Sequence, residues 1–155
     1  MEALTTDDLE KAISEGDIII DTRSISEFKQ GFIRGSIALS TIEKFKEYAS
    51  ALTGFDLNKA NTSVLLVLEE SDKDRWVETI RNFGVNIKGY LSGGFNSWQK
   101  AGLPVDMIIH VEADELMMDI PFDNNLIVVD IRPPIAFGSG PLRHAVNMPL
   151  NDINN

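Results

Sequence analysis

The chain has 155 residues, 43% of them hydrophobic and 25% charged, a balance typical of a globular protein. Its 14 basic and 24 acidic residues give a formal net charge of −10, which argues against binding nucleic acid or an anionic membrane surface. The sequence contains no cysteine, which excludes disulfides, thiolate metal sites and any cysteine nucleophile within these residues.

No sequence signal points to a membrane, an export pathway or a metal. No apolar run approaches the roughly 18 residues that a membrane helix needs, and the N-terminal Met1-Glu2-Ala3-Leu4 lacks the features of a signal peptide. We therefore expect a cytoplasmic protein with no cofactor, no nucleic-acid partner and no membrane partner. His110 and His144 lack a second ligand at a metal-binding spacing, so we predict no metal site.

Helix and strand signals alternate along the chain. Apolar runs predict strands, most clearly at Val64–Leu68, and capping residues such as Thr5 and Ser24 predict helix starts. The predicted strands are residues 18–20, 36–39, 64–68 and 87–91. One predicted helix ends near residue 14, and a second begins at residue 24. Three more span about residues 41–52, 72–83 and 93–101. Trp76, Ile80 and Phe83 lie on one side of the helix at residues 72–83. This alternation predicts an α/β fold, in which helices cover both faces of a central parallel sheet of about five strands.

Part of the pattern occurs twice. Asp21-Thr22-Arg23 recurs 109 residues later as Asp130-Ile131-Arg132. The same offset relates Phe28 to Phe137, Gly31 to Gly140, Arg34 to Arg143, Ile37 to Val146 and Leu39 to Met148, and an offset of 107 relates Leu9 and Ile13 to Leu116 and Ile120. We therefore predict a duplication, with a complete domain in residues 1–108 and the N-terminal part of a second in residues 109–155.

The first copy resembles the rhodanese family in its N-terminal half. The apolar strand that ends in Asp21-Thr22-Arg23 resembles the family's first-strand signature. Residues 28–36, which include Gly31 and Gly35, resemble its F-x-x-G-H-I-x-G-A stretch, although Phe32 stands where the histidine is usual.

A C-terminal run carries the most specific part of the resemblance. Residues 91–105, which include Gly93, Gly94 and Trp98, resemble the run L-x-G-G-x-x-x-W-x-x-x-G-x-P-V. The resemblance covers about residues 4–108 in full and 111–155 in part, and it implies a three-layer α/β/α fold.

The resemblance also locates a degenerate active-site loop. In active family members, the strand equivalent to Val64–Leu68 ends in a cysteine, and the amides of the following loop hold an anionic persulfide. Here the segment consists of Leu68, Glu69, Glu70, Ser71, Asp72, Lys73, Asp74 and Arg75. It has no cysteine, its serine would need a positioned base, and its four carboxylates would repel an anion. We therefore predict no catalytic residue in this loop.

The sequence signals for other chemistry at these positions are weaker. Asp21 and Asp130 end strands, as phosphoacceptor aspartates do, but an arginine two residues later favours a structural ion pair. The loop carboxylates lack the spacing of an EF-hand, and a lone Gly-Gly is weak evidence for a phosphate site. We therefore assign structural roles to the motif residues Asp21, Arg23, Gly31, Gly35, Gly93, Gly94, Trp98, Asp130 and Arg132.

The combination of a cysteine-free acidic loop and a second partial copy is similar to the tandem rhodanese region of bacterial metallo-β-lactamase-fold proteins related to persulfide dioxygenases. This resemblance implies a non-catalytic module, structural or interacting, in a larger sulfur-metabolism protein. The alternative is a fragment of a sulfurtransferase whose active cysteine lies in the missing part of the second repeat. The expected partners are other domains of a larger polypeptide or another copy of the chain.

Overall fold

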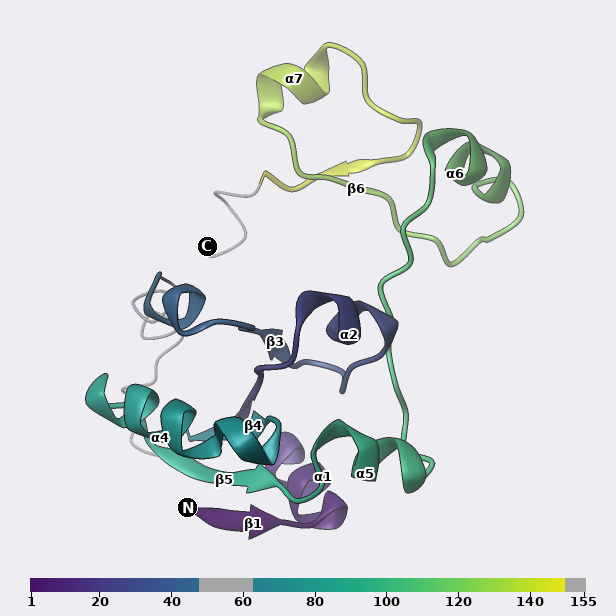
Figure 1. Cartoon of the computed structure of the whole chain (residues 1–155). Coiled ribbons are helices and arrows are strands. Elements are labelled where there is room, and N and C mark those ends of the chain that lie inside the picture. The colour runs from purple at the N-terminus through teal and green to yellow at the C-terminus, as the bar shows by residue number, and fades with distance from the viewer. Residues whose placement is uncertain (48–62, 150–155) are drawn as a thin grey trace. The chain divides into compact units, whose positions relative to one another are not determined.

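The computed structural model describes residues 1–47 and 63–149 (Figure 1). Contacts within the chain divide it into two compact units, Met1–Ile109 and His110–Asn155, which we call unit 1 and unit 2.

Unit 1 contains a five-stranded parallel sheet with the order β1-β5-β4-β2-β3. The strands are β1 (Glu2–Leu4), β2 (Ile18–Asp21), β3 (Ile37–Ala38), β4 (Val64–Val67) and β5 (Ile87–Leu91). The central strand β4 pairs with β2 from Ile18↔Val64 to Asp21↔Val67. All four of its side chains are buried, as expected for a strand covered on both faces. The predicted α/β fold with a central parallel sheet is therefore confirmed.

Strand β1 is an element that the sequence did not reveal. It has only three residues and lies in parallel beside β5, with Glu2 opposite Gly89 and Leu4 opposite Leu91. A Cβ atom on Gly89 would lie 2.8 Å from the Glu2 carbonyl oxygen and 2.7 Å from Leu4 Cγ. The absence of a side chain at Gly89 therefore allows β1 to approach and complete the sheet.

The helices of unit 1 begin close to the predicted caps. They are α1 (Thr6–Ser14), α2 (Ile25–Gln30), a helical segment at residues 42–47, α4 (Lys73–Asn82) and α5 (Gly94–Lys100). Thr5 and Ser24 form capping boxes with Asp8 and Glu27, so two backbone amides at each helix start are bonded by side chains. The part of the predicted helix at residues 41–52 that follows residue 47 lies outside the described residues.

Two apolar clusters fill the two faces of this sheet. Because side chains alternate along a strand, Leu66 belongs to one cluster while Leu65 and Val67 belong to the other. The first cluster takes Phe45 from residues 42–47, and Trp76 and Ile80 from α4. The second takes Leu9 from α1, and Phe95 and Trp98 from α5. Helices therefore cover both faces of the sheet.

Phe83 departs from the predicted core stripe of α4. It follows the end of the helix as its C-cap residue and is 44% exposed. Its ring contacts Phe45 edge-on, with the ring centroids 5.5 Å apart. The chain turns away at Gly84, whose φ of +74° is the left-handed conformation predicted for the residue after the cap.

The described residues of unit 2 form a two-stranded parallel sheet and two short helices. The elements are α6 (Ala113–Asp119), β6 (Val129–Asp130), α7 (Pro134–Gly138) and β7 (Val146–Asn147). Val129 pairs with Val146, just as Ile20 pairs with Ile37 in unit 1, so both members of the pair are shifted by 109 residues. No described residue of unit 2 is buried, whereas unit 1 has a core.

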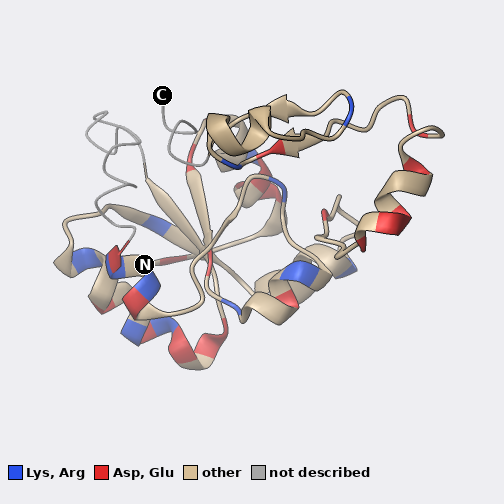
Figure 2. Cartoon of the chain, turned by 90° about the horizontal axis from the view of Figure 1, so that it is seen from above, with Lys and Arg blue, Asp and Glu red and all other residues tan. Residues whose placement is uncertain are grey.

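Most charged residues of the chain lie on helices and loops rather than on strands (Figure 2). Within residues 1–47 and 63–149, no helix is both long enough and apolar enough to cross a membrane.

The contact at Gly89 gives a first prediction. Gly89→Ala should lower the free energy of unfolding by about 1–3 kcal/mol, because the added methyl group displaces β1. Urea denaturation followed by tryptophan fluorescence measures this loss. The same substitution in a chain that lacks residues 1–4 should cost much less, and equal losses in both chains would contradict this account of the contact.

Candidate functional site

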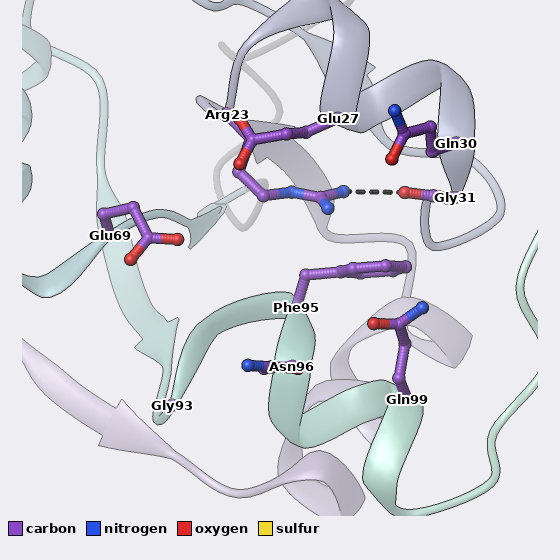
Figure 3. Close-up of a pocket in the computed structure, with 9 residues that line it drawn as sticks. All are labelled: Arg23, Glu27, Gln30, Gly31, Glu69, Gly93, Phe95, Asn96 and Gln99. Carbon is purple, nitrogen blue, oxygen red and sulfur yellow. Dashed lines mark hydrogen bonds between the residues drawn. The ribbon is translucent and has the colours of Figure 1, made fainter.

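A cavity of about 390 Å³ lies beside the carboxyl ends of strands β2, β4 and β5. This edge of an open parallel sheet is where ligands bind in α/β proteins. The residues that line the cavity are Arg23, Glu27, Gln30, Gly31, Glu69, Gly93, Phe95, Asn96 and Gln99 (Figure 3).

Arg23 is the buried charged side chain among the residues that line this cavity, and it forms an ion pair with Asp21 at the end of β2. The Arg23 Nη2 atom lies 2.6 Å from Asp21 Oδ2, Nε lies 3.0 Å from Oδ1, and the two side chains are 7% and 0% exposed. Nη2 also donates to the Gly31 carbonyl at 2.9 Å, and the guanidinium carbon lies 3.8 Å from the centre of the Phe95 ring (Figure 3). The arginine therefore connects β2 to α2 and α5.

Glycines allow this close packing. A Cβ atom on Gly31 would lie 3.0 Å from Val105 Cγ1 and 3.3 Å from the Phe95 ring. Gly93 and Gly94 have φ values of +73° and +57°, and a Cβ atom on Gly94 would lie 3.1 Å from the Leu68 carbonyl oxygen. The Gly-Gly pair therefore forms a tight turn from β5 into α5, directly beside the end of β4.

The loop after β4 forms a tight helical turn. Leu68 is buried, and Glu69, the first exposed residue after the strand, lines the cavity. Residues Glu70–Asp72 form a 3₁₀ turn (η1), which continues into α4. The Asp72 amide donates to the Glu69 carbonyl at 3.0 Å, and the Lys73 amide donates to the Glu70 carbonyl. Two amides of the loop are thus used within the turn and are not free to bind an anion.

A second contact fixes the same turn. Lys73 Nζ lies 2.6 Å from Glu70 Oε1, and the Tyr90 hydroxyl lies 3.4 Å from that oxygen. The hydrogen bond to Glu70 raises the pKa of Lys73 above its ordinary value. Ser71 is exposed and has no side-chain hydrogen bond to any described residue, so no base is positioned to activate its hydroxyl.

Apart from Arg23, the polar side chains that line the cavity are carboxylates and carboxamides. Asp21 neutralises Arg23, whereas Glu27 and Glu69 add two carboxylates. The hydrogen bond from the Ser24 hydroxyl lowers the pKa of Glu27, which keeps it ionised. An anion such as a persulfide would therefore meet net negative charge at this edge of the sheet.

The cavity includes only part of the predicted set. Glu69 is the one residue of the predicted loop that lines the cavity. The motif residues that line it are Arg23, Gly31 and Gly93. Gly35 lies in a separate turn with φ of +82°, and the Trp98 indole donates to the Pro104 carbonyl at 2.9 Å. The carboxamides Gln30, Asn96 and Gln99 belong to no sequence motif, although Asn96 and Gln99 have the i, i+3 spacing of one helix face.

Asp130 and Arg132 of unit 2 repeat the local geometry of Asp21 and Arg23. Arg132 Nη2 lies 2.6 Å from Asp130 Oδ2 and 3.2 Å from the Gly140 carbonyl oxygen. The Arg132 side chain is 50% exposed, compared with 7% for Arg23. The hydrogen bond from Arg132 lowers the pKa of Asp130.

Among the residues that the structure describes, no group of three or more His, Asp or Glu side chains could hold a metal ion.

The comparisons with known proteins identify the family. The model of the rhodanese-like domain matches residues 5–101, which is more than half of the chain. The chain therefore belongs to the rhodanese-like family. No match was found among the curated proteins.

Solved structures of this fold resemble the chain at low sequence identity. A rhodanese-related protein from Thermoplasma volcanium is 23% identical, with a TM-score of 0.54, and the match covers 69% of this chain and 99% of that chain. A rhodanese-like domain from Anabaena sp. is 22% identical, with a TM-score of 0.55 and coverage of 82% and 92%. A complex of EanB with hercynine is 20% identical, with a TM-score of 0.50, and this match covers 95% of this chain but only 40% of EanB.

The two Asp–Arg pairs give a matched prediction. Asp21→Asn should lower the free energy of unfolding of unit 1 by about 3–5 kcal/mol, because it leaves a buried guanidinium without its counter-ion. Asp130→Asn should leave the unfolding of unit 1 unchanged. Both tryptophans, Trp76 and Trp98, lie in unit 1, so urea denaturation followed by their fluorescence measures this unit alone. Similar effects of the two substitutions would contradict this reading of the buried pair.

Proposed function

We propose that unit 1 is a non-catalytic rhodanese-like module with a structural or interaction role. The observation that carries the proposal is the turn after β4, where the family resemblance implies a nucleophilic cysteine and this chain has none. The amides of Asp72 and Lys73 are bonded within this turn, and Glu27 and Glu69 place negative charge in the adjoining cavity. Both the nucleophile and the environment that would stabilise its anion are therefore missing.

The proposal extends to the setting of the module. The repeated Asp–Arg–Gly geometry and the shared strand register support the idea that residues 109–155 are the first part of a second rhodanese-like copy. The likeness to EanB also covers most of both units in one chain. We place the module in a cytoplasmic sulfur-metabolism protein with a metallo-β-lactamase-fold domain, where its partners are other domains or another copy of the chain.

A second candidate function is enzymatic. In a sulfurtransferase parent, the active cysteine would follow the strand of the second copy that corresponds to β4. Unit 2 favours this possibility because it carries the Asp130–Arg132 pair in the same geometry as the first copy. In that case unit 1 supports the second copy and does no chemistry itself.

A thiosulfate:cyanide sulfurtransferase assay tests the non-catalytic role. We expect no thiocyanate above the uncatalysed rate from the purified chain, and a domain with an active-site cysteine serves as the positive control. Measurable turnover by the 155-residue chain would refute the proposal.

A Glu69→Cys variant separates the loss of the nucleophile from the loss of the anion site. Alkylation by iodoacetamide at several pH values would show whether the new thiol ionises. We expect a thiol with an ordinary or raised pKa and no turnover, because the amides of Asp72 and Lys73 are bonded within the turn, Glu27 lines the same cavity and Glu70 is the next residue in the chain. Turnover by this variant would mean that the turn opens and that only the sulfur atom was missing.

A further inference from the structure

One nitrogen of the buried Arg23 guanidinium has no partner among the described residues. Nε and Nη2 are bonded to the Asp21 carboxylate, and Nη2 also donates to the Gly31 carbonyl. Nη1 donates to no described residue, although the Arg23 side chain is only 7% exposed. Every enclosed side-chain nitrogen and oxygen among the described residues has a partner, so Nη1 is not enclosed and faces the cavity that Arg23 lines (Figure 3). Its N–H groups can donate to an oxygen atom of a bound molecule.

Two carboxylates that line the same cavity have free oxygens. The Ser24 amide and hydroxyl both donate to Oε2 of Glu27, which leaves Oε1 without a donor among the described residues. The Glu69 carboxylate accepts no hydrogen bond from a described residue, and Figure 3 shows it extending from the end of β4 toward the side of Arg23. Asp21 already neutralises Arg23, the one basic residue among the described residues of the lining. The two carboxylates therefore attract a cationic group.

The rest of the lining suits a small polar molecule. Gln30 of α2 and Asn96 and Gln99 of α5 add carboxamides, each of which can donate and accept hydrogen bonds. The Phe95 ring supplies the apolar part of the wall. The cavity volume of about 390 Å³ lies within the range of small-molecule sites.

We propose that this cavity binds a small zwitterion, a molecule that carries a primary ammonium group and a carboxylate, as amino acids do. The ligand carboxylate accepts from Nη1 of Arg23, and the ammonium group lies against the carboxylates of Glu27 and Glu69. A simple anion would meet the net negative charge of the lining, whereas a simple cation would leave Nη1 unused. A zwitterion meets both requirements, because its two charges match the two ends of the site.

This inference deepens the proposed function and rests on it, because it gives the cavity of a non-catalytic module a binding role in place of a chemical one. The two proposals fail in different assays. Thiocyanate production together with zwitterion binding would overturn only the non-catalytic role. The absence of both would overturn only the present inference.

Titration of the full chain with ω-amino acids of increasing length tests the proposal. The probes are glycine, γ-aminobutyrate and 6-aminohexanoate, which separate the ammonium and carboxylate groups by different distances. We expect saturable binding of at least one of them, with a dissociation constant on the order of 1 mM for so small a molecule. In ¹⁵N NMR spectra, the signals of the Arg23 guanidinium and of the Asn96 and Gln99 carboxamides should shift together.

The amine and the carboxylic acid of the same chain length are the matched controls for the tightest probe. Each lacks one of the two charged groups and should bind at least about tenfold more weakly, because one end of the site is left without a partner. Failure of all three amino acids to bind would overturn the inference. Equally tight binding of the amine or of the acid would do the same, because the site would then recognise a single charge.

Glu69→Gln tests the wall that faces the ammonium group. The Glu69 side chain has no hydrogen bond to a described residue, so this substitution should leave the urea unfolding midpoint unchanged. It should weaken binding of the zwitterion by about three- to tenfold. Glu78→Gln makes the same change in net charge on an exposed position of α4 that does not line the cavity, and it should leave the affinity unchanged. Equal effects of the two substitutions would contradict the proposed site.

Discussion

The ion pair between Asp21 and Arg23 connects the sheet to the candidate site. Its carboxylate ends β2, which lies between β4 and β3, and its guanidinium packs between the Gly31 carbonyl and the Phe95 ring. A buried charge of this kind is tolerated only when its partners are all in place, because each ion loses its hydration. The positions of α2 and α5 beside the cavity therefore depend on one pair of side chains. Gly31 and Gly94 support that arrangement by leaving room where a Cβ atom would be too close.

The same edge of the sheet keeps the rhodanese-like fold although the chain has no cysteine there. The strand order, the capping boxes and the arginine contacts are those of a well-packed parallel sheet. The turn after β4 is equally well formed, but two of its amides bond to its own carbonyls and the Lys73 side chain bonds to Glu70. Stability and anion binding compete for the same backbone groups here. In this chain, hydrogen bonds within the turn use these backbone groups.

Much of unit 1 could be predicted from the sequence because its signals are local. The capping boxes at Thr5 and Ser24, the aliphatic run of β4 and the glycine after α4 each depend on a few adjacent residues. Strand β1 could not be predicted, since three residues carry no periodic pattern and its place depends on a distant glycine. The exposure of Phe83 also depends on tertiary structure, because helix α4 ends at Asn82, one residue before it.

The candidate site was predictable only in part. The sequence identified Arg23, Gly31, Glu69 and Gly93 through motifs, but the carboxamides of α2 and α5 belong to no motif. They become neighbours only when the two helices pack across the Arg23–Phe95 contact.

Strand order also has a consequence for synthesis of the chain. Strand β1 leaves the ribosome before the other elements of unit 1, yet its only strand neighbour among the described residues is β5, which is translated last of the five strands. The N-terminal residues must therefore wait, unpaired, until nearly the whole of unit 1 has emerged. Co-translational folding of this sheet would proceed from its middle outward, with the first-made segment docking at the end.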